Sequence, residues 1–326
     1  MEKYEQMMKK FICLLICFLL PTLSACDVKR MAEHSFFAMD TIVTLKCSRE
    51  SAEKIEKLIR EYENILSPTD PESELYLLNN NLTQNISQKF LSVFKSAYEI
   101  SEKTDGNYNF GVYPLILEWG FTTKKYNVPS PQRIKELLPV TNFKDFEIKN
   151  DTLFKKNDAM IDFGGITKGF VCDEAVRILK DANEKKSLLS LGGNVYALGK
   201  EWKVAIKSPF GDSYAGILKA QNCAIVTSGS YERYFEKEGN VYHHIIDPKT
   251  GYPADNSLAS VTIVSESATT ADGYSTALFV MGFEKACEFY RKHYDFDAIF
   301  ILKNGDIFVT EGIADNFSAE NFKIIR

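Results

Sequence analysis

The chain has 326 residues, of which 45% are hydrophobic and 25% are charged, and its formal net charge is −5 at pH 7. This length suffices for one large or two modest hydrophobic cores. The acidic balance gives no support for nucleic-acid binding, which requires a basic surface. The four scattered cysteines after residue 26 have no CxxC spacing, so they indicate buried small apolar side chains rather than a zinc site.

Residues 1–25 have the pattern of a secretory signal peptide. Lys9 and Lys10 precede an apolar run over 11–20, which is too short to span a bilayer as a stable helix, and small residues follow it. The run ends in LSAC, which resembles a lipobox and implies cleavage before Cys26 and lipidation of that cysteine. The alternative is an ordinary secretory signal with a chance cysteine.

The lipobox leads to an expectation for the mature protein. We expect 1–25 to be a lipoprotein signal peptide, 26–35 a tether after the lipidated cysteine, and 36–326 the folded domain. Several acyl chains hold a protein at a membrane, where one chain would be marginal. Asp27 follows the cysteine, and in bacteria with two membranes that residue type is typical of lipoproteins kept on the inner membrane. The expected location is therefore the extracytoplasmic, periplasmic side of the cell (inner) membrane.

From residue 36 onward, helical and strand-like hydrophobic patterns alternate irregularly. The helical pattern predicts helices at 51–66, 88–104, 129–139, 166–182 and 269–293. Strands are predicted at 36–47, 158–165, 186–199, 201–209, 224–231, 240–247, 258–265 and 297–310. Asn304-Gly305 is a strong signal for a two-residue hairpin within the last of these. Because no regular βαβ repeat emerges, we expect an α+β fold with mixed sheets and packed helices.

Two double glycines mark places where the backbone can approach a ligand. In DFGGITKGF, Gly164-Gly165 lies where a strand gives way to a helix, whose N-terminus attracts phosphate, and Lys168 follows in the first turn. A plain strand–turn–helix junction explains this stretch equally well. In SLGGNVYALG, the second double glycine is also explained by a bulged hairpin.

In TTADGYSTAL, Asp272 and Thr276 stand four residues apart. On a helix they share one face, and their carboxylate and hydroxyl can reach one hard cation, which prefers oxygen ligands. The alternative is an aspartate that complements the helix dipole and a threonine packed in the core.

In YHHIIDPKTG, His243 and His244 alternate faces if the segment is a strand, so only one of them points into a given pocket. An imidazole takes up a proton near neutrality and can serve as a base. A lone histidine is nevertheless more often a satisfied polar residue.

Taken in order, eight stretches over about residues 36–310 resemble the ApbE family, the FAD:protein FMN transferases. They are FFAMDTIVTL, LSPTDPESELYLLN, DGNYNFGVYPLILEWGF, MIDFGGITKGF, SLLSLGGNVYALG, VTSGSYERYF, HHIIDPKTGYP and ATTADGYSTALFVMG. Each is weak alone, but eight in the right order are highly specific. The resemblance implies an ApbE-like, T-fold-related architecture.

The resemblance also implies a mechanism. FAD binds with its pyrophosphate on Mg²⁺, a Thr or Ser hydroxyl of a target flavoprotein attacks the flavin-side phosphorus, and AMP leaves. Asp272 and Thr276, with the carbonyl of Gly165, match the family's metal ligands. His244 becomes the candidate base or hydroxyl-orienting group. Flavin-nucleotide contacts match Met39, Thr69, Asn107, Tyr108, Asn109, Asp162, Lys168 and Ile246, the last through its main chain.

The sequence departs from the family pattern at two of these positions. The family usually has an aspartate where Asn109 stands, so the negative charge is lost but an acceptor oxygen remains. The family often has a tyrosine where Thr69 stands, so an aromatic stacking partner would be missing.

Three functions remain open from the sequence. The first is the FMN transferase, with acceptors such as subunits of RNF-type or Na⁺-translocating NADH:quinone redox complexes. The second is a Mg²⁺-dependent FAD pyrophosphatase that gives FMN and AMP. The third is a non-enzymatic FAD-binding lipoprotein, which the Asp272–Thr276 pair disfavours because storage needs no metal site.

Overall fold

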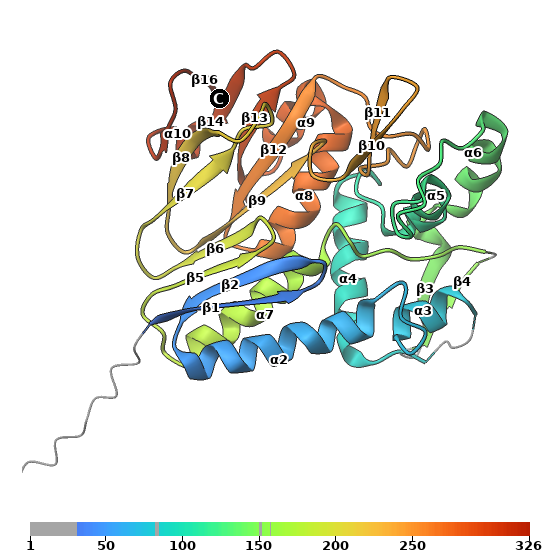
Figure 1. Ribbon diagram of the computed structural model, residues 1–326, viewed down its shortest axis with the longest axis horizontal. Coiled ribbons are helices and arrows are strands. Elements are labelled where there is room, and N and C mark those ends of the chain that lie inside the picture. The colour runs from blue at the N-terminus through green and yellow to red at the C-terminus, as the bar shows by residue number, and fades with distance from the viewer. Residues whose placement is uncertain (1–30, 82–84, 150–151, 157) are drawn as a thin grey trace, which may run out of the picture.

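The computed structural model describes residues 31–81, 85–149, 152–156 and 158–326 (Figure 1). The expected signal peptide, the lipidation site Cys26 and the first half of the expected tether lie outside these ranges. Within them, no helix is both long and apolar enough to cross a membrane.

A nine-stranded sheet forms the centre of the molecule, in the order β1-β2-β5-β6-β9-β12-β13-β14-β16. All neighbours are antiparallel except β14 and β16. The strands are β1 (Ala32–Ala38), β2 (Thr41–Cys47), β5 (Ser187–Leu191), β6 (Asn194–Leu198), β9 (Cys223–Gly229), β12 (Leu258–Ser265), β13 (Asp297–Leu302), β14 (Ile307–Thr310) and β16 (Lys323–Ile325). The mixed sheet confirms the α+β prediction.

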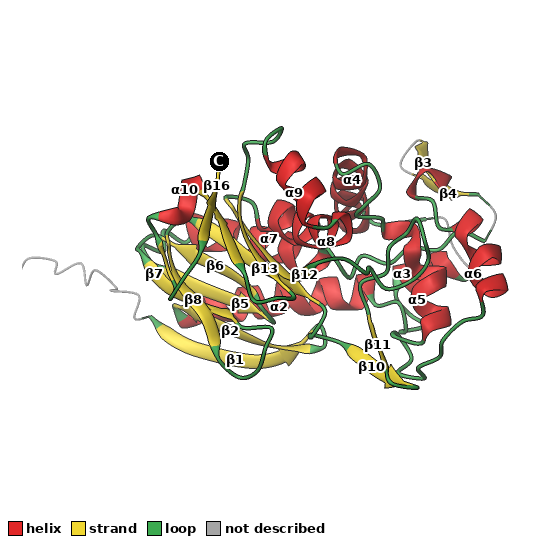
Figure 2. Ribbon diagram, turned by 90° about the horizontal axis from the view of Figure 1, so that it is seen from above, coloured by secondary structure: helices red, strands yellow, loops and turns green. Residues whose placement is uncertain are grey.

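Both faces of this sheet are covered. Helices lie on one face (Figure 2), namely α2 (Arg49–Leu66), α7 (Thr167–Asp181), α8 (Ala268–Met281) and α9 (Phe283–Tyr290), with α4 (Gln88–Lys103) packed against α8. The other face packs against a three-stranded sheet of β7 (Trp202–Lys207), β8 (Tyr214–Ala220) and β15 (Phe317–Ser318), next to the short helix α10 (Glu311–Ala314). Every residue of β12 is buried, as expected for a strand covered on both sides.

A lateral region extends from the α4 side of the sheet (Figure 1). It contains α3 (Glu74–Asn79), η1 (Phe110–Val112), α5 (Tyr113–Trp119), α6 (Pro131–Leu137), η2 (Leu138–Val140), η3 (Phe143–Asp145) and the hairpins β3 (Phe146–Lys149)–β4 (Thr152–Lys155) and β10 (Tyr234–Lys237)–β11 (Asn240–His243). Trp119, which is fully buried, contacts the ring of Tyr242 and donates from Nε1 to the carbonyl of Gly251 at 2.9 Å. The motifs PLILEWGF and HHIIDPKTGYP therefore pack on each other.

The predicted strand 36–47 is wrong in one respect, because it is a hairpin of two strands. Met39 and Asp40 form its turn with φ of 52° and 56°, a left-handed conformation that no glycine signals in the sequence. β1 begins at Ala32, within the expected tether 26–35, and pairs in full register with β2 from Ala32↔Cys47 onward. As an edge strand β1 is largely exposed, so its first half carries no hydrophobic alternation.

Three other predicted elements differ from the structure. The segment 158–165 is predicted to be a strand that runs into a turn, and it has the turn at Gly164-Gly165 but no strand. The side chain of Asn79 bonds both the N–H and the carbonyl of Ile161 in place of a neighbouring strand. The predicted helix 269–293 is broken at Gly282, whose φ is 78°. The predicted strand 240–247 ends at His243. At the second double glycine, by contrast, β5 and β6 form the expected hairpin.

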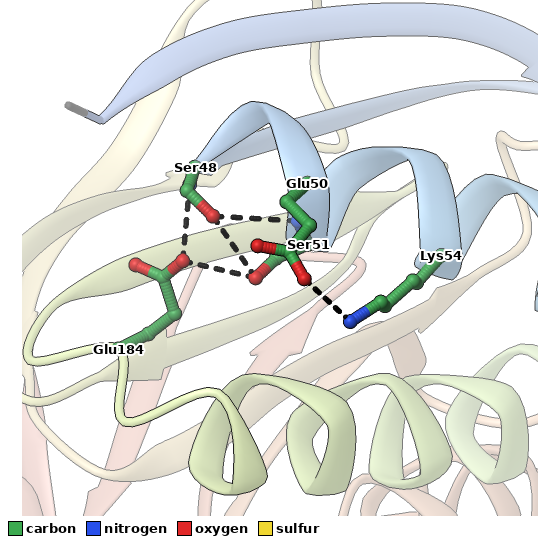
Figure 3. A network of polar contacts seen from close by, with 5 residues as sticks. All are labelled: Ser48, Glu50, Ser51, Lys54 and Glu184. Atoms are coloured by element: carbon green, nitrogen blue, oxygen red, sulfur yellow. Dashed lines mark hydrogen bonds and ion pairs between the residues drawn. The ribbon is translucent and has the colours of Figure 1, made fainter. Parts of the chain in front are cut away.

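A polar network fixes the start of α2 against the chain that leaves α7 (Figure 3). Ser48 caps α2 by accepting from the N–H of Ser51 at 3.3 Å. The carboxylate of Glu184 accepts from the Ser48 N–H at 3.3 Å and from the Ser51 hydroxyl at 2.9 Å. The two helices that flank the edge of the sheet are thus tied at one end.

Candidate functional site

The site is built where α7 and α8 cross. A Cβ atom on Gly169 would lie 2.2 Å from the carbonyl oxygen of Ala268 and 2.6 Å from the Cβ of Asp272, so only glycine allows this approach. The Asp272 Oδ2 accepts from the Gly169 N–H at 2.8 Å. Ile166, the N-cap residue of α7, has no capping side chain. The carboxylate of Asp272 therefore caps α7 from the neighbouring helix.

Thr276 lies one turn further along α8 and meets the loop before α7. A Cβ atom on Gly165 would stand 3.2 Å from the Thr276 Oγ1 and 3.2 Å from a ring carbon of Tyr108. The Ser228 hydroxyl of β9 lies 3.4 Å from the Thr276 Oγ1. The predicted residues Gly165, Asp272 and Thr276 thus come together, with a serine that the spacing alone did not indicate.

Two carboxyl groups and a lysine give this site its charge. Burial raises the pKa of Asp272 and also that of Asp162, while the positive charge of Lys168 lowers both. Asp162 also accepts from the N–H of Gly164 at 3.0 Å, which lowers its pKa. Lys168 is therefore close enough to both carboxyl groups to favour their ionised forms.

Tyr108 lies near the same two carboxyl groups. It is 3% exposed, and its hydroxyl has no hydrogen-bond partner among the residues that the structure describes. Burial raises the pKa of this hydroxyl well above its usual value, and the nearby Asp162 and Asp272 raise it further. A neutral buried hydroxyl without a partner costs free energy, which a bound polar ligand would recover.

The two histidines face different clusters. The His243 ring packs edge-on against Phe279, and its Nε2 lies 3.1 Å from the carbonyl of Ala254. The His244 ring contacts Phe121 in the lateral region. The packing thus agrees with the predicted alternation, although the strand itself ends at His243.

His244 is held in one tautomer. Its main-chain N–H and its Nδ1 both point to the carbonyl oxygen of Arg233, at 3.0 Å and 3.1 Å. A carbonyl oxygen only accepts, so Nδ1 carries the proton and Nε2 presents its lone pair. Burial, and then the charge of Arg233, lower the pKa of His244 to about 3, so the ring is neutral at pH 7.

Asn109 has a structural role. Its Oδ1 accepts from the Gly111 N–H at 2.8 Å, and its Nδ2 donates to the carbonyl of Thr141 at 2.7 Å. The acceptor bond is one that an aspartate could also make, as we expected. The donor bond to Thr141 requires the amide, which accounts for an asparagine at this position.

The other predicted contact residues have partners outside this cluster. Asn107 accepts from the Nζ of Lys249 at 3.4 Å, and the side chain of Ile246 is buried in the lateral region. Met39 lies in the β1–β2 turn, where its N–H donates to Glu63 at 2.6 Å. Thr69 is exposed, with its hydroxyl 3.4 Å from that of Ser67.

Besides Ser228, three further residues near the site were not predicted from the sequence. Asn194, which follows the second double glycine, lowers the pKa of Asp272 through its side chain. Arg233 holds His244 and lowers the pKa of Asp162. Burial and then Asp162 raise the pKa of Tyr113 to about 12. Only Asn194 had a local signal, namely the glycines before it.

The oxygen donors fit a hard cation. Within the described ranges, no group of three or more His, Cys, Asp or Glu residues could hold a metal ion. Of the two carboxyl groups, only that of Asp272 belongs to the expected ligand set, together with the Thr276 hydroxyl and the main chain of Gly165. Such a sparse oxygen set suits Mg²⁺, which binds through one or two carboxylates and completes its shell with substrate phosphates and water.

Comparisons with known proteins show which family the chain resembles. The ApbE family model matches residues 39–300. The chain is 34% identical over 292 residues to the FAD:protein FMN transferase of Klebsiella pneumoniae, covering 86% of this chain and 92% of that protein. It is 31% identical over 289 residues to the FAD:protein FMN transferase of Treponema pallidum, covering 81% and 80%.

Solved structures share the fold. The ApbE protein of Thermotoga maritima superposes with a TM-score of 0.83 at 34% identity, covering 88% of this chain and 99% of that one. The apo flavinyl transferase ApbE of Pseudomonas stutzeri superposes with a TM-score of 0.79 at 25% identity, covering 90% and 98%. The fold and the relatives together define an enzyme of the transferase class. The chain belongs to the ApbE family.

The lowered pKa of His244 predicts an acid-sensitive fold. An unfolded imidazole takes up a proton near pH 6.5, whereas His244 in the native state does so only near pH 3. Between these values the unfolded state binds more protons, so stability falls as the pH drops through this window. We expect His244→Gln to lose less free energy of unfolding than the wild type between pH 7 and pH 4, measured by urea denaturation. Parallel pH profiles for the two proteins would contradict the shift.

Proposed function

We propose that this chain is a FAD:protein FMN transferase that moves the FMN part of FAD to a Thr or Ser hydroxyl of an acceptor flavoprotein and releases AMP. The observation that carries this proposal is the α7–α8 crossing, which sets the oxygen donors of Asp272, Thr276 and Gly165 beside Lys168. The names of the relatives, FAD:protein FMN transferase, support the same reaction.

The reaction exchanges one phosphorus–oxygen bond for another. The acceptor hydroxyl oxygen bonds to the flavin-side phosphorus, and the bond from that phosphorus to the bridging oxygen breaks. AMP leaves with the bridging oxygen, and FMN remains on the acceptor as a phosphodiester. This chemistry requires positioning and charge neutralisation more than covalent help from the enzyme. The cationic side chains of Lys168 and Arg233, near Asp162, suit a pyrophosphate.

The metal site supports this assignment. Asp272, Thr276 and the carbonyl of Gly165 would hold Mg²⁺, which, when bound, supplies charge neutralisation at the pyrophosphate. The chain itself orients the substrate. The unpartnered hydroxyl of Tyr108 and the nearby carboxyl of Asp162 offer hydrogen bonds to it. Met39, Asn107 and Ile246 remain proposed contacts of the flavin nucleotide, and Asn109 accepts from the Gly111 N–H in the segment that follows Asn107.

His244 is the proposed hydroxyl-orienting residue. Its Nε2 lone pair can accept a hydrogen bond from the acceptor hydroxyl, because Nδ1–H is committed to the carbonyl of Arg233. With a pKa of about 3, the free-enzyme imidazole is a weak base. The negative charge of a bound pyrophosphate would raise that pKa and make proton transfer to Nε2 more favourable.

We also propose that the protein acts at the extracytoplasmic face of the cell (inner) membrane, held by lipids on Cys26. Its acceptors would then be exported or membrane-embedded flavoproteins, such as subunits of RNF-type or Na⁺-translocating NADH:quinone redox complexes. The LSAC motif supports this location. An uncleaved and unlipidated N-terminus in protein isolated from membranes would overturn it.

Mass spectrometry tests the reaction directly. We expect incubation with FAD, Mg²⁺ and an acceptor flavoprotein domain to increase the mass of that domain by one FMN group and to release an equal amount of AMP. Changing the acceptor Thr to Val should abolish the increase. Release of FMN and AMP into solution, with an unmodified acceptor, would instead identify a pyrophosphatase. Stable FAD binding without turnover would indicate storage.

Asp272 should be essential for transfer. Asp272→Asn keeps an oxygen acceptor for the Gly169 N–H but removes the charge that faces the cation. We expect its transfer rate to fall at least about 10²-fold, whereas Ser275→Ala, which removes a hydroxyl bonded to the Asp272 carbonyl at 2.8 Å, should stay close to wild type. Transfer rates are measured with Mg²⁺ and with EDTA. Full Asp272→Asn activity in EDTA would exclude the metal site.

Substitutions of the two histidines should have different effects, one on the transfer rate and the other on stability. We expect His244→Ala to lose transfer by about 10²–10⁴-fold, the range of general-base catalysis, with little change in FAD affinity. His243→Ala should mainly lower the melting temperature, because it removes the contact with Phe279 and the bond to Ala254. Transfer rate, FAD affinity and melting temperature are measured on both. A rate loss in His244→Ala that weaker FAD binding fully explains would rule out the role in transfer.

A further inference from the structure

Asp173, on α7, binds the first turn of α8. Its Oδ1 accepts from the N–H of Ala268 at 2.8 Å. Its Oδ2 accepts from the Ser267 hydroxyl at 2.9 Å and from the Thr269 N–H and hydroxyl at 2.9 Å and 2.6 Å. The N–H groups of a first helical turn have no partner within their own helix, so this carboxylate satisfies groups that would otherwise remain free.

The capping is reciprocal. Asp173 of α7 caps the N-terminus of α8, and Asp272 of α8 caps the N-terminus of α7 through Gly169. Each helix thus holds the start of the other with a carboxylate. Because Gly169 already touches the Ala268 carbonyl, the two helices have little freedom to slide at this contact.

One face of α8 connects this cap to the proposed metal ligands. Ala268, Asp272 and Thr276 are spaced four residues apart and so lie on one side of the helix. All three meet α7 or the loop before it, at Gly169 and Gly165. The position of α8 along α7 therefore sets how the Asp272 carboxylate and the Thr276 hydroxyl stand relative to the Gly165 carbonyl.

We propose that Asp173 is a positioning residue for the metal site, which it controls by fixing the first turn of α8. This inference rests on the proposed role of Asp272 and Thr276 as Mg²⁺ ligands. Asp173 itself lines a different, polar cavity of about 230 Å³, together with Arg177, Thr269 and Thr270. Neither ligand side chain lines that cavity, so Asp173 acts on the site through the helix and not by contact with substrate.

The test compares Asp173→Asn with Asp297→Asn. The first variant keeps the shape of the side chain but places an NH₂ donor against donors of α8. The second removes a half-buried carboxylate that accepts from Thr310 at 2.7 Å and makes no hydrogen bond to the described residues of α7 or α8. Two quantities are measured across a Mg²⁺ titration, the transfer rate and the affinity for FAD by flavin fluorescence. The melting temperature of each variant records the loss of stability.

We expect Asp173→Asn to raise the Mg²⁺ concentration for half-maximal rate about tenfold, near the lower limit of effects seen for residues that orient metal ligands. The Mg²⁺ dependence of FAD affinity should shift equally, and saturating Mg²⁺ should restore most of the rate. Asp297→Asn should lower the melting temperature without shifting either curve. If Asp173→Asn does not fold, Thr269→Val, which removes one hydroxyl donor to Asp173, should shift both curves in the same direction by about twofold.

Two outcomes would overturn the inference in distinguishable ways. In the first, the wild type depends on Mg²⁺ but the Mg²⁺ titration curves of Asp173→Asn are not shifted. The proposed metal site then stands, and Asp173 only stabilises the first turn of α8. A wild type whose rate and FAD affinity do not depend on Mg²⁺ would remove the metal from the proposed function and this role with it.

Discussion

The contact between α7 and α8 at Gly169 is the constraint on which the site depends. A side chain at this position would collide with the Ala268 carbonyl and with Asp272, so the helices meet backbone to backbone. This approach brings the carboxylate of Asp272 to the start of α7, where the lysine and the glycine-rich loop also lie. A structural cap and a proposed metal ligand are therefore the same oxygen-bearing group, and the energy that stabilises the helix pair also holds the site in shape.

The lateral region supplies the contacts that hold His244. Trp119 joins the turn after β11 to α5, and that turn follows the two histidines. The carbonyl of Arg233, before β10, fixes the tautomer of His244. The proposed site would thus form between the sheet–helix body, which provides oxygen donors, and a smaller aromatic cluster, which positions a neutral imidazole. This division explains why the matching sequence motifs are spread over most of the chain.

The sequence predicts those features of the fold whose interacting residues lie close together in the chain. Local signals succeed where hydrogen bonds are local, as in the stripe of α2, and the spacing of Asp272 and Thr276 correctly predicts one helical face. A hairpin does form at Asn304-Gly305, but residues 303–306 separate its strands rather than the two residues expected. The extended segment at Ile161 was misread as a strand because its partner, Asn79, is a side chain far away in the sequence. No local pattern could place Arg233 beside His244, since only the pairing of β10 with β11 does so.

With the proposed lipid anchor on Cys26, the early start of β1 would restrict where the enzyme can work. Sheet pairing begins at Ala32, six residues after Cys26. Six residues span at most about 21 Å even when fully extended. With lipids on Cys26, the folded body would stay within about that distance of the bilayer surface and could not search the surrounding compartment. Substrate proteins would then be selected by the height at which they expose their hydroxyl above the membrane, as well as by the sequence around it.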